Sequence, residues 1–440
     1  MVTERNKTES IFNIGNYIKE ESLGGFILIL MTVVAIVWAN SSYYDYYYYL
    51  WHDLKFGISL GNFELNKALH YWINDGLMAI FFFMVGLEIK REVLAGELST
   101  IKKASLPLSA AVGGMVVPAL MYVIFNYNNP ESMAGWGIPM ATDIAFALGM
   151  MSLLGKRVPI NLKIFLTALA IADDLGAILV IAIFYTESID VNELMNAGIF
   201  LAILMGANRL GVRRVTFYAL VGFIGVWISF FYSGIHATIA GVLIALTIPV
   251  RTKISESTYI DKLHILLHRF EKASPNDKSL LTQKQAHLVS DIESLSKDAH
   301  TPLQKLEHAL HPITAYIILP IFALSNAGVR IEGDFFGLLF HPISLGIIFG
   351  LVAGKAIGIS LFSHLMVKLK MASLPEGLTW RHIYGAGLLG GIGFTMSIFI
   401  AGLAFVSDEF IQIAKVGIFT ASFLAAVAGL LILARAKISD

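Results

Sequence analysis

The chain has 440 residues, of which 56% are hydrophobic and only 15% are charged, and its mean hydropathy is +0.70. Soluble domains carry charge on about a quarter of their residues, so this composition excludes an ordinary soluble protein and indicates a polytopic membrane protein. The net charge is zero and no long basic cluster is present, so we expect a lipid bilayer as the environment and no nucleic-acid partner. Because the chain has no cysteine, a disulfide, a thiolate metal site and a cysteine nucleophile are excluded.

Twelve apolar segments are predicted to form transmembrane helices, which makes the fold class an all-α polytopic membrane protein. Acidic residues dilute the lysines that precede the first segment, so we interpret it as a retained helix rather than a signal peptide. The predicted helices cover residues 23–40, 72–92, 105–125, 134–154, 161–185, 191–208, 214–231, 235–250, 313–329, 341–364, 383–404 and 413–435.

Two polar stretches interrupt this pattern. Residues 41–71 contain an aromatic cluster suited to the membrane interface, followed by a stretch that alternates around a Gly-Asn pair. The alternation predicts a short external β-hairpin near 52–66, with an irregular loop as the alternative. Residues 251–312 form a long polar loop, in which the apolar spacing over 280–295 fits one or two amphipathic surface helices or a loosely ordered linker.

Lysine and arginine in the short loops predict the orientation of the helices. Loops near 127–133, 186–190 and 232–234 contain neither residue, which places them outside and both termini in the cytoplasm. The basic residues assigned to the cytoplasmic side are Lys90, Arg91, Lys102, Lys103, Lys156, Arg157, Lys163, Arg209, Arg213, Arg214, Lys368, Lys370, Arg381, Arg435 and Lys437. The resulting parts are a cytoplasmic N-terminal segment (1–22), helices one to eight with the hairpin (23–250), a long cytoplasmic loop (251–312), helices nine to twelve (313–435) and a cytoplasmic tail (436–440).

Two adjacent carboxylates, Asp173 and Asp174, lie near the middle of the apolar run 166–184. A charged side chain at bilayer depth costs about 3 kcal/mol or more, so such residues usually face a cavity or a partner and carry function. We interpret the pair as a binding site for a small cation, with a buried salt bridge as the alternative. Adjacent helical residues diverge by about 100°, so one carboxylate faces an ion cavity while the other meets another helix. Oxygen ligands suit sodium or lithium rather than soft metals.

Two further segments are candidates for interrupted membrane helices. Pro139 removes a backbone donor shortly before Thr142 and Asp143, and several glycines lie within 385–402. An interrupted helix exposes carbonyls and helix ends that must face protein or a water-filled cavity, and many transporters build ion sites in this way. The spacing of Thr142, Phe146 and Gly149 recurs in Thr395, Phe399 and Gly402, which is consistent with an internal repeat.

Lys355 is the single basic residue of the apolar stretch 345–362. An ammonium this far from either end of the segment needs a buried anion, and Asp173 and Asp143 are the candidates. Such a pair would hold its charge in place until a competing cation or proton releases it. The alternative is a lysine whose ammonium extends to the membrane surface.

Titratable side chains near the ends of the predicted helices are candidate pH sensors, because histidine titrates near neutral pH. Two glutamates spaced four apart share a helix face, a second group immediately precedes the ninth helix, and one histidine lies near the external boundary. The alternatives are solvated charges at a loop edge and, for the last residue, a packed histidine. The candidates are Glu88, Glu92, Glu307, His308, His311 and His236.

A carboxylate that binds either a proton or a hard cation, in a protein that alternates its access, exchanges one ion for the other. The chain is therefore expected to be a transporter rather than an enzyme, with no cofactor beyond its transported ions. A sodium-coupled solute symporter is the alternative, and it would need a larger substrate cavity. An intramembrane aspartyl protease also needs two buried aspartates, but neither Asp143 nor Asp173 has the GxGD context expected there.

Across residues of about 10–250 and 305–435, the chain resembles the NhaA family of bacterial sodium/proton antiporters. The motifs occur in the same order along the chain, which makes the resemblance specific. They are WINDGLMAIFFFMVGLEIKRE at 72–92, ATDIAFALG at 141–149, LAIADDLGAI at 169–178, SGIHATIAG at 233–241, KLEHALHP at 305–312 and GGIGFTMSIFIA at 390–401.

The resemblance implies twelve transmembrane helices with inverted repeats and two discontinuous helices, the fourth and the eleventh, that cross at the midplane. It implies that Asp174 and Asp173 bind the cation and the protons, with Thr142 beside them. The lysine matching Lys355 pairs with the aspartate matching Asp173 in this family, and together with Asp143 it balances charge at the broken helix ends. The candidate pH sensors match positions that are tied to activation at alkaline pH or to the pH response.

The resemblance also implies electrogenic exchange of cytoplasmic sodium or lithium for external protons, with alternating access and pH regulation, in the bacterial cytoplasmic (inner) membrane. The external hairpin is similar to the one that pairs protomers in a homodimer. The loop over 252–303 is much longer than in the best-known members of the family. One hypothesis is that this loop tunes the pH gating, and an unchanged pH profile after deletion of 256–300 would rule it out.

Overall fold

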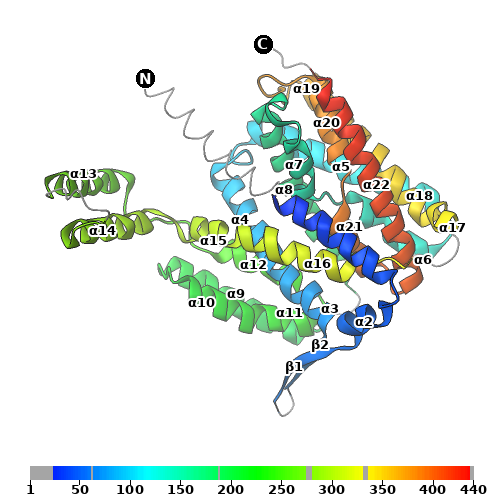
Figure 1. Ribbon diagram of the computed structural model, residues 1–440, viewed down its shortest axis with the longest axis horizontal. Helices are drawn as coiled ribbons and strands as arrows, with labels where there is room; N and C mark the ends of the chain where they lie inside the picture. The colour runs from blue at the N-terminus through cyan, green and yellow to red at the C-terminus, as the bar shows by residue number, and fades with distance from the viewer. Residues whose placement is uncertain (1–22, 61–62, 187–188, 274–279, 331–334, 437–440) are drawn as a thin grey trace.

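Helix dominates the fold because a backbone surrounded by lipid must satisfy its hydrogen bonds within each segment. The computed structural model describes residues 23–60, 63–186, 189–273, 280–330 and 335–436 (Figure 1). Within these residues, eight helices are long and apolar enough to cross a membrane, or nine if one bent pair counts as a single span. Two shorter apolar helices, Leu23–Ala39 and Thr238–Thr247, accompany them. The predicted all-α membrane fold is therefore confirmed.

The long helices differ in regularity. Four are α-helical throughout: α5 (Ile101–Asn126), α8 (Ile160–Phe184), α9 (Val191–Arg209) and α22 (Asp408–Ala434). Four others contain a π-helical turn, a widening that is frequent at functional sites. They are α3 (Leu69–Tyr71) with α4 (Met78–Ala95), α10 (Val215–Val221) with α11 (Ile228–Ser233), α15 (Pro302–Ile313) with α16 (Leu319–Asn326), and α18 (Pro342–Phe349) with α19 (Lys355–Lys368). Their π-helical turns are Trp72–Leu77, Gly222–Trp227, Thr314–Ile318 and Gly350–Gly354.

The other helical elements are shorter. The α-helices among them are α2 (Tyr44–Tyr48), α6 (Pro130–Met133), α7 (Ile144–Ser152), α12 (Thr238–Thr247), α17 (Phe335–Leu339), α20 (Trp380–Leu389) and α21 (Phe394–Ala404). A π-helical turn covers Tyr49–Asp53, and 3₁₀ segments cover Ala134–Met140 and Gly155–Arg157. The pair α20 and α21 is the bent one, with an angle of 47° between its halves.

The helix expected to begin at residue 313 begins instead at Pro302. The Thr301 hydroxyl accepts a hydrogen bond from the Gln304 backbone N–H at 3.1 Å, and the Gln304 side chain accepts one from the Thr301 N–H at 3.2 Å. This reciprocal cap stabilises a helix start, and proline at the first helical position needs no donor. The last part of the predicted loop is therefore the start of a long helix, which carries Glu307 and His311.

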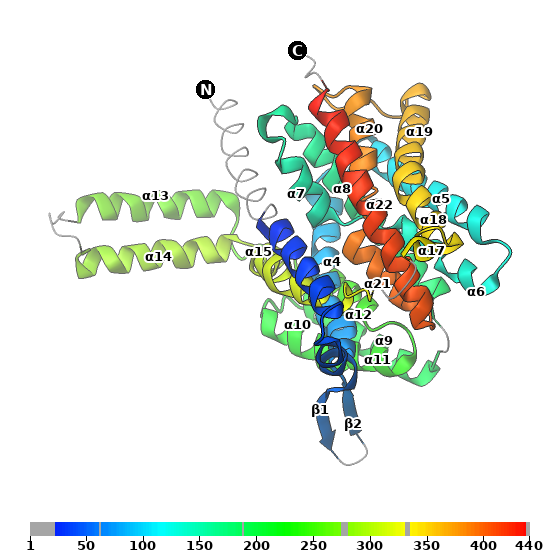
Figure 2. The same cartoon turned by 45° about the vertical axis from the view of Figure 1, so that its right-hand side comes forward.

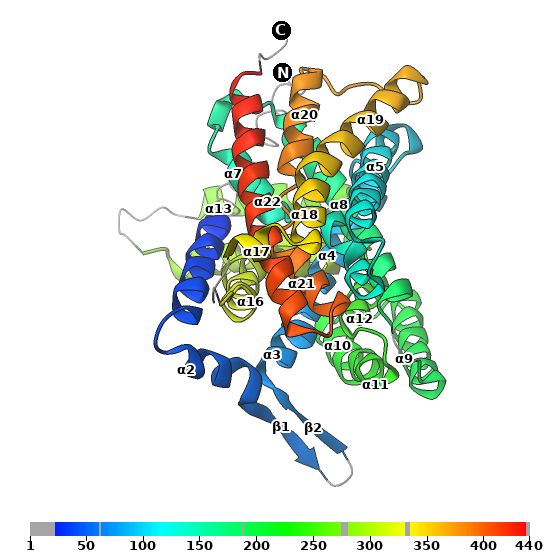
Figure 3. The same ribbon diagram turned by 90° about the vertical axis from the view of Figure 1, so that its right-hand side faces the viewer.

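Small residues bring the helix backbones close together. A Cβ atom added to Gly113 of α5 would collide with the backbone oxygen of Gly358 in α19, and the reverse substitution would collide in the same way. A Cβ on Gly86 of α4 would lie 2.7 Å from the Cβ of Ala245 in α12. Such contacts allow dense packing where the membrane supplies no hydrophobic driving force between helices. On another side of the molecule, α22 packs along α20 and α18 (Figure 3).

The predicted β-hairpin is confirmed. Strands β1 (Lys55–Leu60) and β2 (Phe63–Ala68) pair antiparallel, with Lys55 opposite Ala68 and Leu60 opposite Phe63. The hairpin extends from one end of the helical body (Figure 2), and the Gly-Asn pair at its tip lies outside the described residues. The Trp72 indole N–H donates to the Phe56 carbonyl at 2.7 Å, which fixes the hairpin against the π-helical turn between α3 and α4.

The long polar loop contains two antiparallel helices, α13 (Glu256–Lys272) and α14 (Gln283–Ala299), which extend away from the body (Figure 2). We call α13 and α14 the arm. Tyr259 and Ser296 are hydrogen-bonded across it at 3.2 Å, and Lys253 forms an ion pair with Asp298 at 2.8 Å where its two ends meet. The interpretation as amphipathic helices agrees with this geometry, although α13 begins well before the stretch in which they were expected.

The predicted N-terminal segment 1–22 and residues 437–440 of the predicted tail lie outside the described residues.

We predict opposite effects for two glycine-to-alanine substitutions. Gly358→Ala should lower stability by about 1–3 kcal/mol, because the new methyl group meets the backbone of α5. Gly198→Ala is the matched control, since nothing lies within 4 Å of its added Cβ and alanine favours the helix by about 0.5–1 kcal/mol. Thermal unfolding of the detergent-purified variants measures both, and equal stabilities would contradict the close α5–α19 contact.

Candidate cation site

The first interruption of a helix lies between a 3₁₀ segment and α7. The 3₁₀ segment Ala134–Met140 contains Pro139, which supplies no backbone donor, and Ala141 after it is extended with φ −76° and ψ 148°. Regular helix resumes at Ile144, and Asp143 caps it by accepting a hydrogen bond from the Phe146 N–H at 3.0 Å. The carboxylate of Asp143 therefore sits at the positive end of a helix, where a negative charge is favoured.

The second interruption joins α20 to α21 through Gly390–Gly393. A Cβ on Gly391 would collide with the backbone oxygen of Leu351. Only glycine therefore fits where the segment between α20 and α21 passes beside the π-helical turn Gly350–Gly354. The 47° bend between α20 and α21 follows from this local loss of helix.

The two interruptions satisfy each other's backbone groups. The Asp143 backbone N–H donates to the Ile392 carbonyl at 2.7 Å, and the Thr142 hydroxyl donates to the Gly390 carbonyl at 2.8 Å. In the opposite direction, the Asp143 carboxylate accepts hydrogen bonds from the backbone N–H and the hydroxyl of Thr395. Non-helical backbone at membrane depth is tolerated where protein groups complete its hydrogen bonds, and here the two breaks do so together.

Helix α8 adds Asp173 to this crossing. One carboxylate oxygen, Oδ2, accepts a hydrogen bond from the Thr142 hydroxyl at 2.9 Å and forms an ion pair with the ammonium of Lys355. Both charged side chains are completely buried. Of the two anions that the sequence offered to Lys355, the structure joins it to Asp173, while Asp143 is bound by Thr395.

Asp174 is also buried, and its environment is negative. Asp173, Glu88 and Asp143 act on it as like charges, against the single opposing charge of Lys355. Among the described residues, one oxygen of Asp174 and the Oδ1 atom of Asp173 have no hydrogen-bond partner. Buried carboxylate oxygens normally have donors or a cation, so these two atoms are suited to a cation.

The site does not resemble a tightly chelating metal centre. Within the parts of the chain that the structure describes, no three His, Asp or Glu side chains are arranged to hold a metal ion. Two carboxylates with a nearby threonine hydroxyl and backbone carbonyls instead offer a small set of hard oxygen ligands. Such a set of ligands suits reversible binding of a monovalent cation rather than tight chelation of a metal.

The predicted pH-sensing residues fall into separate places. Glu92 and Glu307 are bridged by Arg91, whose Nη1 lies 3.1 Å from Glu92 and whose Nε lies 2.8 Å from Glu307. Glu88 is buried on the same helix, closer to Asp174, and His311 is buried further along α15.

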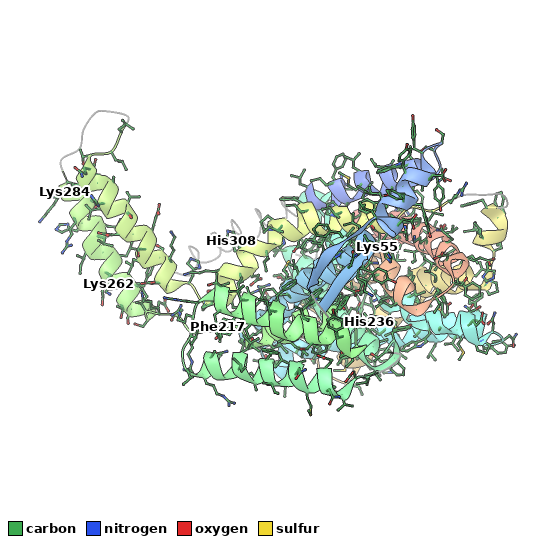
Figure 4. The ribbon with its side chains drawn as sticks, turned by 90° about the horizontal axis from the view of Figure 1, so that it is seen from below. Lys55, Phe217, His236, Lys262, Lys284 and His308 are labelled. Carbon is green, nitrogen blue, oxygen red and sulfur yellow. The ribbon has the colours of Figure 1, made fainter. Side chains whose placement is uncertain are left out.

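The two remaining histidines lie elsewhere. His308 is exposed near the base of the arm (Figure 4). His236 is half-buried toward the hairpin end, and its Nε2 atom lies 2.8 Å from the Tyr185 carbonyl. The structure therefore groups Glu92 and Glu307 around Arg91 and leaves His308 and His236 apart from them.

Thr395 is a site residue that sequence reasoning did not propose. Its backbone N–H and hydroxyl both donate to the Asp143 carboxylate. Thr142, in the other interrupted helix, similarly donates from its hydroxyl to Asp173 of α8. The repeated spacing around Thr142 and Thr395 was the available signal.

Comparison with known proteins gives consistent matches along the whole chain. A family model described as Na+/H+ antiporter 1 matches residues 15–433. The chain is 50% identical over 414 residues to "Na(+)/H(+) antiporter NhaA" of Oleidesulfovibrio alaskensis, covering 94% of this chain and 91% of the relative. It is 50% identical over 417 residues to "Na(+)/H(+) antiporter NhaA 1" of Psychromonas ingrahamii, covering 94% of each chain. It is 47% identical over 431 residues to "Na(+)/H(+) antiporter NhaA" of Helicobacter pylori, covering 97% of each.

We predict that the charge of Lys355 is needed for stability because Asp173 is its buried partner. Removing one member of a buried ion pair typically costs about 3–5 kcal/mol, since the other charge is left uncompensated. Lys355→Met should therefore lower the thermal stability of the purified protein, and the double variant Lys355→Met/Asp173→Asn should recover much of the loss. A double variant as unstable as the single one would contradict this account of the pair.

Proposed function

The chain belongs to the Na+/H+ antiporter 1 family, and on this premise we propose that it exports cytoplasmic sodium or lithium in exchange for external protons. The observation that carries the proposal is the state of the two central carboxylates. Asp173 is bound by an ammonium group, while one oxygen of Asp174 and the second oxygen of Asp173 are buried without a donor among the described residues. These carboxylate oxygens can bind either a cation or a proton.

Competition for these carboxylates couples the two ions. A sodium ion that binds between Asp173 and Asp174 displaces one proton from Asp174 and separates Lys355 from Asp173, so that the unpaired Lys355 loses a second proton. When sodium leaves, protons return to Asp174 and Lys355, and the Lys355 ammonium pairs with Asp173 again. Because neither carboxylate holds both partners at once, sodium and protons cross the membrane in opposite directions.

Asp143 and Lys355 have a second role in this proposal, at the broken helix ends. The amide groups at the starts of α7 and α21 carry partial positive charge, and Asp143 accepts hydrogen bonds from both of them. The carbonyl groups at the end of α20 carry partial negative charge, and Lys355 supplies the positive charge near this crossing. The breaks remain stable at membrane depth because their charges are balanced by these two residues.

The proposed topology has twelve membrane-crossing helices with both termini in the cytoplasm. Beyond the long spans, Leu23–Ala39, the interrupted segment 134–152 and α12 would complete the count. Support for inverted repeats comes from the reciprocal roles of Thr142 and Thr395, each of which binds the other broken helix. The arrangement is typical of transporters whose ion site lies at the midplane between two repeats.

Alternating access requires that the site open to one side at a time. Phe82 of α4 contacts Phe399 of α21 with ring centroids 5.6 Å apart, and Phe322 of α16 lies 6.2 Å from the same ring. All three rings are buried. Phe82 lies on α4 between the hairpin end and Glu88, and we propose that this aromatic layer is the barrier on the hairpin side of Asp174 in the transport cycle.

We further propose that exchange is electrogenic, with more protons than cations moved per cycle, and that the protein works as a homodimer in the bacterial inner membrane. Each net charge moved is worth about 2.3 kcal/mol per 100 mV of membrane potential. The open strand edges of the hairpin can pair with a second copy, which supports the homodimer.

The direct test of antiport is proton movement in everted membrane vesicles. Adding sodium at pH values from 6.5 to 8.5 should dissipate a preformed pH gradient, because internal protons leave as sodium enters the vesicles. Asp174→Asn should abolish the response at unchanged protein abundance. A response that requires an added organic solute would favour the sodium-coupled symporter instead, and its absence at every pH would contradict the proposal.

We predict that the arm sets part of the pH dependence. The arm joins α15 directly, and α15 carries Glu307, which pairs with Arg91. Because Lys253 and Asp298 hold the ends of the arm together, residues 256–297 can be replaced by a short Gly-Ser linker with little strain on the body. The truncated protein should keep its maximal antiport rate but change its pH profile in everted vesicles. An unchanged profile would exclude a tuning role for the arm.

A further inference from the structure

A cavity of about 390 Å³ lies at the hairpin end of the molecule, lined by residues that the central site does not use. Asp75, Lys67, Tyr71, Phe231 and His236 are among its walls. Asp75 and Glu88 lie on the same long helix, roughly 20 Å apart at 1.5 Å per residue. The walls of this cavity include none of the central carboxylates, and the buried Phe82 lies between Asp75 and Glu88 along the helix, so the cavity is a separate place in the molecule.

Asp75 is held at the wall of this cavity by its surroundings. It belongs to the π-helical turn Trp72–Leu77, and its backbone carbonyl accepts a hydrogen bond from the Trp227 indole at 2.9 Å. The neighbouring Asn74 pairs with Asn326 of α16 at 2.9 Å. Asp75 is the only charged residue between Leu69 and Leu87 of this helix, and a half-buried carboxylate in such an apolar stretch is costly and usually functional.

Lys67 brings a cation to the same cavity from the hairpin. Its ammonium lies 5.7 Å from the centre of the Tyr71 ring and 5.8 Å from that of Phe231, within range of cation–π attraction. Asp75 feels its positive charge. Because Trp72 fixes the hairpin by a hydrogen bond to Phe56, which is the strand partner of Lys67, the lysine is held over the cavity. The Lys67 ammonium is therefore a monovalent cation already present in this cavity, attached through a flexible side chain.

We propose that this cavity is a second cation site, through which sodium leaves on the external side, and that the Lys67 ammonium is the tethered competitor that displaces sodium from Asp75. The inference rests on the proposed antiport and on the orientation that places the hairpin outside. Asp75 attracts the cation after it passes the aromatic layer, and Lys67 then replaces it. The lysine keeps external sodium from occupying the site and driving the exchange backwards.

The two residues should change external sodium affinity in opposite directions. Right-side-out vesicles present the external face to added sodium, whereas everted vesicles from the same cells present the cytoplasmic face. In right-side-out vesicles, Asp75→Asn should raise the half-saturating sodium concentration for proton movement by about threefold to tenfold. Lys67→Met should lower this concentration by a similar factor. A change of this size is expected when one charge is removed near a partly hydrated site. In everted vesicles both variants should stay close to the wild type.

Lys55→Met is the matched control. Lys55 is an exposed lysine of the same hairpin, on strand β1, and the cavity walls do not include it (Figure 4). It should leave the half-saturating sodium concentration unchanged on both faces. Wild-type values for Asp75→Asn and Lys67→Met in right-side-out vesicles, or equal shifts on both faces, would overturn the proposal.

A second readout separates this inference from the antiport itself. The Trp72 and Trp227 rings lie 6.3 Å apart beside Asp75, so their fluorescence reports on this end of the protein. Sodium titrated onto the purified protein should change tryptophan emission in the wild type and in Asp174→Asn, but not in Asp75→Asn. A change that persists in Asp75→Asn, or is missing from the wild type, would contradict the second site even if antiport is present. Loss of vesicle antiport with this signal intact would contradict only the proposed function.

Discussion

The ion pair between Lys355 and Asp173 joins α8 and α19 at a buried point, and Thr142 connects it to both interrupted helices. Two full charges with no exposure to solvent are tolerated only when each is the other's partner and further hydrogen bonds complete the site. The Thr142 hydroxyl supplies such a bond to Asp173, and Thr142 sits in the break of one helix while it also binds the break of the other. Burying one ammonium thus fixes the positions of α8, α19 and both interrupted helices.

The surrounding helices serve this crossing by close packing. Lys355 begins α19 immediately after a π-helical turn, and α19 meets α5 at Gly113 and Gly358, where neither helix has room for a side chain. Gly391 lets the second break pass beside that same turn. A bundle of bulkier residues would hold the lysine further from Asp173. The glycines are therefore part of the ion site's geometry although they contact no ion.

The sequence predicted the helical membrane fold, the hairpin and the depth of the central charges, because hydropathy, strand alternation and buried aspartates are local signals. The residues alone left the partner of Lys355 open between Asp173 and Asp143, since that choice depends on how distant helices cross, and only the family resemblance indicated Asp173. Thr395 was missed for the same reason: its bond to Asp143 joins residues far apart in the chain. The early start of α15 was missed because its cap, Thr301 with Gln304, lies in a polar stretch that hydropathy assigns to a loop.

In the proposed cycle, sodium competes with a proton for the Asp173–Asp174 pair. The most direct measurement is calorimetric titration of the purified protein with sodium in buffers of different ionisation enthalpy, which counts the protons released per sodium bound. We expect proton release in the wild type, and no sodium binding to these carboxylates in Asp174→Asn. Sodium binding to the wild type without any proton release would contradict it, because the cation and the proton would then not share one site.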